Sequence, residues 1–307
     1  MTVLTKPRLE GTVEVAPGRY WGFAEFGQPH GRPFIWLHGT PGARRQIPES
    51  ARIAAMNFDI CLIGIDRPGV GASTPYLYDQ ISDFTDDLAV MLDRLGIGDF
   101  AVLGLSGGGP YTLATAAAMT DRVKAVGVMG GVAPTCGPDA VDGGVVALTR
   151  RFQLPLTQLR APITWLFTGL VWAFRPVGDP ALSVYARFSP PGDRLVFARP
   201  EVRAMFLDDL LRGAAKGLRA PIYDIILFGR EWGFDLRDVK VPVHWWHGDA
   251  DNIVPLRHAE QAVAALPDAK LYVRPGESHL GTLIAAEDIL GVLLRTWDES
   301  ERARPLA

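Results

Sequence analysis

The stretch FAVLGLSGGGPYTLATAAAMT, residues 100–120, decides the fold of this 307-residue chain. An apolar run that ends at Ser106 is followed directly by an alanine-rich segment, with Pro110 where the first turn of a helix tolerates proline. This order predicts a buried strand, a tight turn at the serine and then a helix. Such a turn brings the residues two before and two after the serine close together, and both are glycine here, Gly104 and Gly108.

The serine at this turn is the candidate nucleophile. A sharp strand-to-helix turn projects Ser106 Oγ above the sheet edge, and it aims the Gly107 N–H at the oxygen that becomes negative during acyl transfer. The alternative is a glycine-rich turn that cradles a phosphate, but no Walker lysine follows and the spacing is not G-x-G-x-x-G. We therefore predict Ser106 as nucleophile and Gly107 as one backbone donor of an oxyanion hole.

Short apolar runs alternate with helical patterns along most of the chain, which is typical of α/β proteins. Continuous apolar runs predict strands buried on both faces of a parallel sheet, at residues 33–39, 58–66, 100–106 and 123–131. Residues 13–27 read as an antiparallel hairpin, and residues 83–97 as an amphipathic helix that Gly96 helps to stop. A final amphipathic helix is expected from about residue 280.

The alternation stops after about residue 135 and returns near residue 238. We predict an α/β core in two parts, residues 1–134 and 238–307, with an inserted helical cap at residues 135–237. The aromatic side chains of the cap suggest an apolar acyl pocket, although the simpler interpretation is that they form the core of the cap itself: Trp165, Phe167, Trp172, Phe174, Tyr185, Phe188 and Phe197. Contact of residues 163–174 with a membrane surface is a further hypothesis.

A serine hydroxyl needs a base, and in an α/β architecture of this type the chain order is serine, then acid, then histidine. Two of the six histidines precede the serine, two belong to the strand near residue 245, and His258 begins a helical segment. His279 follows the predicted strand 270–276 after a short loop, where a side chain can lean over the sheet edge. We predict His279 as the base.

The acid should leave the end of the preceding strand, where Asp249 and Asp251 are both available. Asp249 is suited to capping the turn, and Asp251 lies further into the loop with apolar residues behind it, so the residues alone favour Asp251 only slightly. A metal site that combines these two carboxylates with His244 and His247 is disfavoured, because strand alternation places the two histidines on opposite faces.

The second oxyanion donor is expected in the loop after the strand at residues 33–39, where the Thr40 N–H is the natural candidate. Five ordered segments now resemble a cap-bearing member of the α/β-hydrolase superfamily: HGTPG (38–42), DRPGVGAS (66–73), GLSGGGP (104–110), HGDADNIVP (247–255) and GESHLG (276–281). The resemblance implies an eight-stranded, mostly parallel twisted sheet with helices on both faces. It also implies that the second aspartate of the acid loop, Asp251, completes the triad. The sequence departs from the family in the Glu-Ser that precedes His279, where many members have a glycine pair.

The resemblance leaves several chemistries open. A serine at the turn argues against epoxide hydrolases and dehalogenases, which use an aspartate there, and it favours a carboxylic ester hydrolase acting on an apolar or medium-sized ester. The alternatives are a carbon–carbon bond hydrolase, an amidase or aminopeptidase, or a non-catalytic ligand-binding member. A proline-type aminopeptidase is less favoured, because the cap shows no obvious acidic cluster for a substrate ammonium. No metal or organic cofactor is required by this chemistry.

Charge, cysteine content and the apolar segments narrow the possible partners and location of the protein. The formal net charge is −3 and no lysine- or arginine-rich run is present, so nucleic acid is not expected as a partner. Two cysteines, Cys61 and Cys136, fall short of a disulfide framework. The first residues contain no apolar signal region, and the longest apolar stretch is too short to span a bilayer, so a cytoplasmic protein is expected. The sequence does not indicate an oligomeric state.

Overall fold

The computed structural model describes residues 4–144, 191–213 and 219–302, together with residues 147, 155, 157–164, 166, 169, 183, 187 and 189. Of the seven aromatic residues named for the cap, only Phe197 lies within the described residues, where it is buried. The other six lie outside the described residues. So does most of the segment 163–174 of the membrane-contact hypothesis, of which the structure describes residues 163, 164, 166 and 169.

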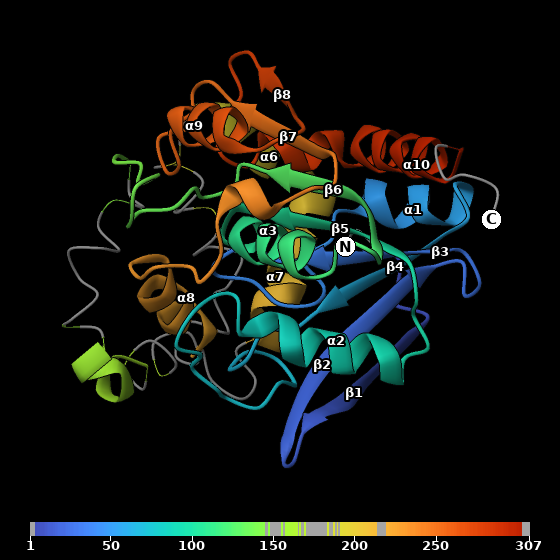
Figure 1. The fold of residues 1–307 in the computed structure, drawn as a ribbon, viewed down its shortest axis with the longest axis horizontal. Coiled ribbons are helices and arrows are strands. Elements are labelled where there is room, and N and C mark those ends of the chain that lie inside the picture. Colours follow the sequence, from blue (N-terminus) through green and yellow to red (C-terminus); the bar gives the residue numbers. More distant parts are fainter. Residues whose placement is uncertain are drawn as a thin grey trace.

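An eight-stranded sheet forms the centre of the protein (Figure 1), with the strand order β1-β2-β4-β3-β5-β6-β7-β8. The strands are β1 (Leu9–Ala16), β2 (Arg19–Gly27), β3 (Arg32–Leu37), β4 (Ile60–Ile65), β5 (Phe100–Leu105), β6 (Val123–Met129), β7 (Val243–Gly248) and β8 (Ala269–Arg274). The first two form the predicted hairpin, which pairs with β4 in antiparallel fashion. All other neighbours in the sheet are parallel. The expected fold class is therefore confirmed.

Helices cover both faces of the sheet, which explains why the strand sequences are continuously apolar. On one face α1 (Glu49–Asn57) and α10 (Ala286–Arg302) lie side by side (Figure 1) and pack on Phe34 and Trp36. On the other face residues of α2 (Phe84–Arg94), α3 (Gly109–Ala118) and α9 (Arg257–Ala265) share one apolar core with Ile35 and Leu37. Successive residues of β3 thus enter opposite cores, as the alternation of a strand requires.

Between β6 and β7 the described residues contribute helices but no strand to the sheet. These helices are α6 (Pro191–Phe197), α7 (Pro200–Gly213) and α8 (Ala220–Phe228), and all three fall within the predicted cap. The final helix begins later than expected: a 3₁₀ turn occupies Gly281–Ala285 and α10 starts at Ala286. Within the described part of the chain, no helix has the length and apolar character needed to cross a membrane.

Candidate active site

The turn between β5 and α3 holds Ser106 in an unusual backbone conformation. Its φ is +51°, in the left-handed region that residues with side chains rarely adopt. A Cβ atom built on Gly104 would lie 2.6 Å from the carbonyl carbon and oxygen of Gly108, so no larger residue fits there. The two glycines therefore allow the close approach that the sequence pattern predicted, and the serine sits at its apex.

Three side chains from distant parts of the chain form one hydrogen-bonded series at this turn. Ser106 Oγ lies 2.8 Å from His279 Nε2, and His279 Nδ1 lies 2.7 Å from Asp251 Oδ2. All three residues are buried. With the ring proton on Nδ1, the imidazole donates to the carboxylate and its free Nε2 accepts from the serine hydroxyl. The structure thus brings together the three residues named from the sequence.

The two aspartates of the acid loop occupy different environments. Asp251 is 4% exposed, and its Oδ1 accepts the N–H groups of Ile253 and Val254, both at 2.9 Å. Asp249 is exposed and accepts the Gly276 N–H at 2.7 Å, and among the described residues no hydrogen bond joins it to His279. Asp251 is the carboxylate that faces the imidazole.

A second imidazole lies against the same carboxylate, and the sequence reasoning did not assign it a role. His247 Nδ1 accepts from the Trp245 indole N–H at 3.2 Å, so the ring proton is on Nε2. That Nε2 lies 2.7 Å from the Val254 carbonyl oxygen and 3.4 Å from Asp251 Oδ2. The pairing of Trp245 with His247 on one strand face was a signal that the histidine points inward beside the acid.

His244 lies on the opposite face of β7, as alternation predicted. Its Nδ1 is 2.9 Å from the Tyr272 hydroxyl and its Nε2 is 2.8 Å from the Thr296 hydroxyl. The disfavoured metal site is therefore not assembled from the two strand histidines. In the residues that the structure describes, no group of three or more His, Cys, Asp or Glu side chains has a metal-binding arrangement.

Burial and charge shift the pKa values of Asp251 and His279 in opposite directions. Burial raises the pKa of Asp251, but the charge of protonated His279 and the bonds from His247 and His279 outweigh it, so the pKa falls well below its usual range. Burial lowers the pKa of His279, and the charge and hydrogen bond of Asp251 outweigh this effect, so the net pKa is raised. The pair therefore favours an imidazolium beside a carboxylate, the charge state that develops when the base takes a proton.

The loop after β3 lies directly against the serine turn. A Cβ atom built on Gly39 would lie 3.5 Å from Ser106 Cβ, and one built on Gly107 would lie 2.2 Å from Thr40 Oγ1. The Gly39 N–H donates to the Gln46 side chain at 2.6 Å, whereas the Thr40 N–H has no hydrogen-bond partner among the described residues. Thr40 and Gly107 thus face each other beside the serine, and their role as oxyanion donors stays a prediction.

Buried carboxylates on helices of the predicted cap bind core loops, and the sequence reasoning missed them. Asp193 of α6 accepts the Leu280 N–H at 2.8 Å, one residue after the candidate base. Asp209 of α7 accepts the N–H groups of Ala43 and Arg45 at 2.8 and 3.1 Å. Burial raises the pKa of both carboxyls, that of Asp209 to about 7. Neither residue carried a clear signal in the sequence, because Asp193 lies between a glycine and an arginine and Asp209 follows a second aspartate.

Comparison with known proteins agrees with the fold. A family model described as alpha/beta hydrolase fold matches residues 32–157. A proline iminopeptidase of Neisseria meningitidis is 36% identical over 134 residues, and this match spans 42% of each chain, less than half the length of that relative. A non-heme haloperoxidase of Rhodococcus erythropolis is 26% identical over 86% of this chain and 91% of its own.

Solved structures give the same fold over nearly the whole chain. An esterase from Exiguobacterium antarcticum superposes with a TM-score of 0.68 at 17% identity, covering 94% of this chain and 100% of its own. At this identity the likeness concerns the fold alone. With the matched family model and the observed sheet order, it shows that the protein has the α/β-hydrolase fold.

Proposed function

We propose that this protein is a serine hydrolase that cleaves an apolar or medium-sized carboxylic ester through an acyl-enzyme. The observation that carries the proposal is the buried series from Ser106 Oγ through His279 to Asp251, with distances of 2.8 and 2.7 Å. A serine in a strained turn that bonds to a histidine oriented by a carboxylate has the arrangement needed for nucleophilic catalysis. The fold, shared with esterases of known structure, supports the same reaction class.

In the first half-reaction Ser106 Oγ attacks the ester carbonyl carbon while His279 Nε2 takes the hydroxyl proton. Asp251 holds the imidazole with its proton on Nδ1 and stabilises the imidazolium that forms. The carbonyl oxygen becomes an anion, and the N–H groups of Thr40 and Gly107 are the proposed donors, each contributing about 3 kcal/mol in the transition state. His279 then gives its proton to the departing alcohol, which leaves the acyl group on the serine.

In the second half-reaction water replaces the alcohol. His279 removes a proton from the water as its oxygen attacks the acyl carbon, and it returns a proton to Ser106 Oγ when the acid leaves. No step requires a group beyond these side chains, the two amides and water. We further propose that residues 135–237 form a cap over the site.

A second candidate, cleavage of an N-terminal proline from a peptide, is favoured by the 36% identity to proline iminopeptidases. The same series of side chains serves amide and ester cleavage, so the chemistry does not separate the two. A substrate with a free amino terminus needs a carboxylate that reaches it. In the part of the predicted cap that the structure describes, the buried aspartates Asp193 of α6 and Asp209 of α7 do not meet that need, because backbone N–H groups already bond to them. We therefore place the ester hydrolase first.

The deciding experiment measures hydrolysis of p-nitrophenyl esters of increasing acyl length beside prolyl anilide and diketone substrates. We expect ester turnover, stoichiometric labelling of Ser106 by a fluorophosphonate, and loss of both in Ser106→Ala, with kcat lower by about 10⁶-fold. A folded wild-type protein that resists the phosphonate would instead indicate a non-catalytic binding protein. Turnover of the prolyl anilide at a higher kcat/KM than any ester would make the peptidase the principal activity.

A further inference from the structure

Helix α8 enters the core beside the serine turn although it belongs to the predicted cap. It lies on the side toward which the arrowheads of β4 and β6 point (Figure 1). Its Asp224 is 2% exposed, and Phe228 Cζ would be 3.0 Å from a Cβ atom built on Gly107. The helix therefore packs against one of the two proposed oxyanion donors.

Asp224 collects hydrogen bonds from three separate segments of the core. Arg67 donates through Nε to Oδ1 at 3.2 Å and through Nη2 to Oδ2 at 2.6 Å. The Tyr111 hydroxyl donates to Oδ1 at 2.7 Å, and the Thr40 hydroxyl donates to Oδ2 at 2.5 Å. These donors come from the loop after β4, from α3, which follows the serine, and from the oxyanion loop. One carboxylate thus joins the segments that surround the serine.

Arg67 in turn holds the oxyanion loop by its carbonyl groups. Its guanidinium donates to the carbonyl oxygens of His38 and Gly39, the latter at 3.1 Å, and to Thr40 Oγ1 at 3.0 Å. In a planar trans peptide the C=O and the following N–H point in opposite directions. Because the Gly39 carbonyl points toward Arg67, the Thr40 N–H must point away from it. The guanidinium therefore sets the direction of the proposed oxyanion donor.

This orientation depends on the charge of the aspartate. Arg67 is 1% exposed, so water does not solvate its cation, and Asp224 is the carboxylate that it contacts. Neutral carbonyl groups alone are weaker partners for a buried guanidinium than a bidentate carboxylate. The contact between α8 and the loop after β4 extends beyond this pair, because the N–H groups of Arg219 and Ala220 donate to the Gly69 carbonyl at 3.0 and 3.2 Å.

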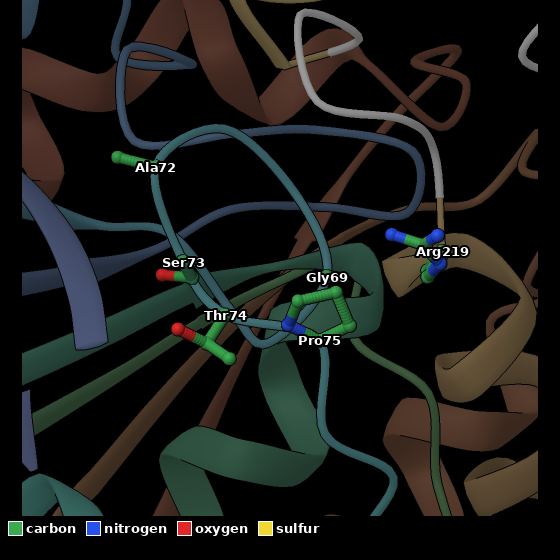
Figure 2. A pocket seen from close by; sticks show the side chains of 6 residues that line it. All are labelled: Gly69, Ala72, Ser73, Thr74, Pro75 and Arg219. Atoms are coloured by element: carbon green, nitrogen blue, oxygen red, sulfur yellow. The ribbon is translucent and has the colours of Figure 1, made fainter. Parts of the chain in front are cut away.

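A cavity of about 260 Å³ opens beside this contact, with the loop after β4 on one side and Arg219 on the other (Figure 2). The hydroxyl groups of Ser73 and Thr74, which line it, already have backbone partners. The cavity therefore marks the edge of the contact between α8 and the core, and we assign it no ligand.

We infer that Asp224 is a positioning residue for the oxyanion hole: it fixes Arg67, which turns the Gly39 peptide so that the Thr40 N–H faces the substrate oxygen. This inference rests on the proposed ester hydrolysis. It predicts that the cap helix contributes to the transition state without touching the substrate. A merely structural role would change stability and leave the rate constant of the chemical step alone.

The test compares Asp224→Asn with Asp87→Asn in the full chain. Asp87 of α2 is a matched control, because it is 5% exposed and also accepts from a tyrosine hydroxyl, that of Tyr78, and from an arginine, Arg19 at 2.8 Å. For Asp224→Asn we expect kcat on the preferred p-nitrophenyl ester to fall by about 10- to 100-fold, with KM changed by less than about threefold. Asp87→Asn should lower the melting temperature but keep kcat within about twofold, because it leaves the oxyanion loop intact.

A second measurement uses butylboronic acid, whose tetrahedral adduct with Ser106 resembles the intermediate. Its inhibition constant should rise in parallel with the loss of kcat for Asp224→Asn and stay unchanged for Asp87→Asn. Equal kcat values in the two variants, or an effect on KM alone, would overturn the inference while ester hydrolysis by the wild type stands. A wild type that neither turns over esters nor reacts with a fluorophosphonate overturns the proposed function and this inference with it.

If Asp224→Asn does not fold, Thr40 variants decide the matter. Thr40→Val removes the hydroxyl that bonds to Asp224 and Arg67 while it keeps the shape of the side chain. We expect kcat to fall by about tenfold or more, and Thr40→Ser, which restores the hydroxyl, to recover most of that loss. Equal kcat in the valine and serine variants would show that the hydroxyl network does not position the amide.

Discussion

Replacing Asp251 by asparagine tests the assignment of the acid, and the structure fixes how the new side chain would sit. Oδ1 accepts two backbone N–H groups, from Ile253 and Val254, so the amide oxygen must take that position. The NH₂ group then occupies the place of Oδ2 and faces His279 Nδ1, where two donors conflict. The imidazole therefore adopts the tautomer with its proton on Nε2, which cannot accept the Ser106 proton.

The cost of the wrong tautomer is about 10⁴-fold in kcat, or about 5 kcal/mol of transition-state stabilisation. The assay is steady-state hydrolysis of the preferred p-nitrophenyl ester, with circular dichroism to show that the variant is folded. Asp249→Asn is the matched control, because that carboxylate is exposed and accepts only the Gly276 N–H among the described residues. We expect it to retain kcat within about threefold. A mild effect of Asp251→Asn together with a severe effect of Asp249→Asn would refute the reasoning and reassign the acid.

Two further predictions concern stability. Gly104→Ala should lower the free energy of unfolding by about 3 kcal/mol, because its methyl group meets the backbone of Gly108, whereas Gly98→Ala, with open space around it, should change the free energy by less than about 1 kcal/mol in urea titrations. His258, which is buried and accepts the Ala133 N–H, has a pKa that burial lowers from 6.5 to about 4. The unfolded state therefore binds the proton more readily, and stability falls as the pH drops from about 6.5 to about 4. As the pH falls from about 7 to about 4.5, the free energy of unfolding of His258→Gln should rise by about 2 kcal/mol relative to that of the wild type. Parallel profiles of unfolding free energy against pH for the two proteins would contradict this.

Elements that the local sequence determines were predictable. The apolar runs at residues 33–39, 58–66 and 100–106 correspond to β3, β4 and β5, because only a sheet covered on both faces needs such continuity. The start of the last helix was not predictable from its amphipathic pattern. The Leu280 N–H bonds to Asp193 of α6, so a contact from a distant segment shapes the turn that precedes α10.

The residues of the candidate site also differ in how far the sequence alone predicted them. Glycine spacing identified the turn at Ser106, since steric limits there act between residues four apart in the chain. The choice between Asp249 and Asp251 depended on the resemblance, because two residues in one loop differ only in the partners that the fold brings to them. The ion pair between Arg67 and Asp224 had a weaker signal in the sequence. An aspartate within the apolar segment APIYDIILF indicates a buried carboxylate, but nothing identified Arg67, 157 residues away, as its partner.

Stability alone does not explain the carboxylates that the predicted cap buries in the core. A buried ion pair contributes little net free energy compared with apolar residues of the same size, because desolvation offsets the attraction. Such a pair does make every other arrangement costly, since separation leaves a buried charge without a partner. Asp224 of α8 forms such a pair with Arg67. Asp193 of α6 and Asp209 of α7 accept backbone N–H groups instead, and a displaced helix would leave each buried carboxyl without its donors. We therefore expect these helices to remain docked through turnover and to hold the catalytic loops in register, because moving any of them would disturb the groups that the reaction needs fixed.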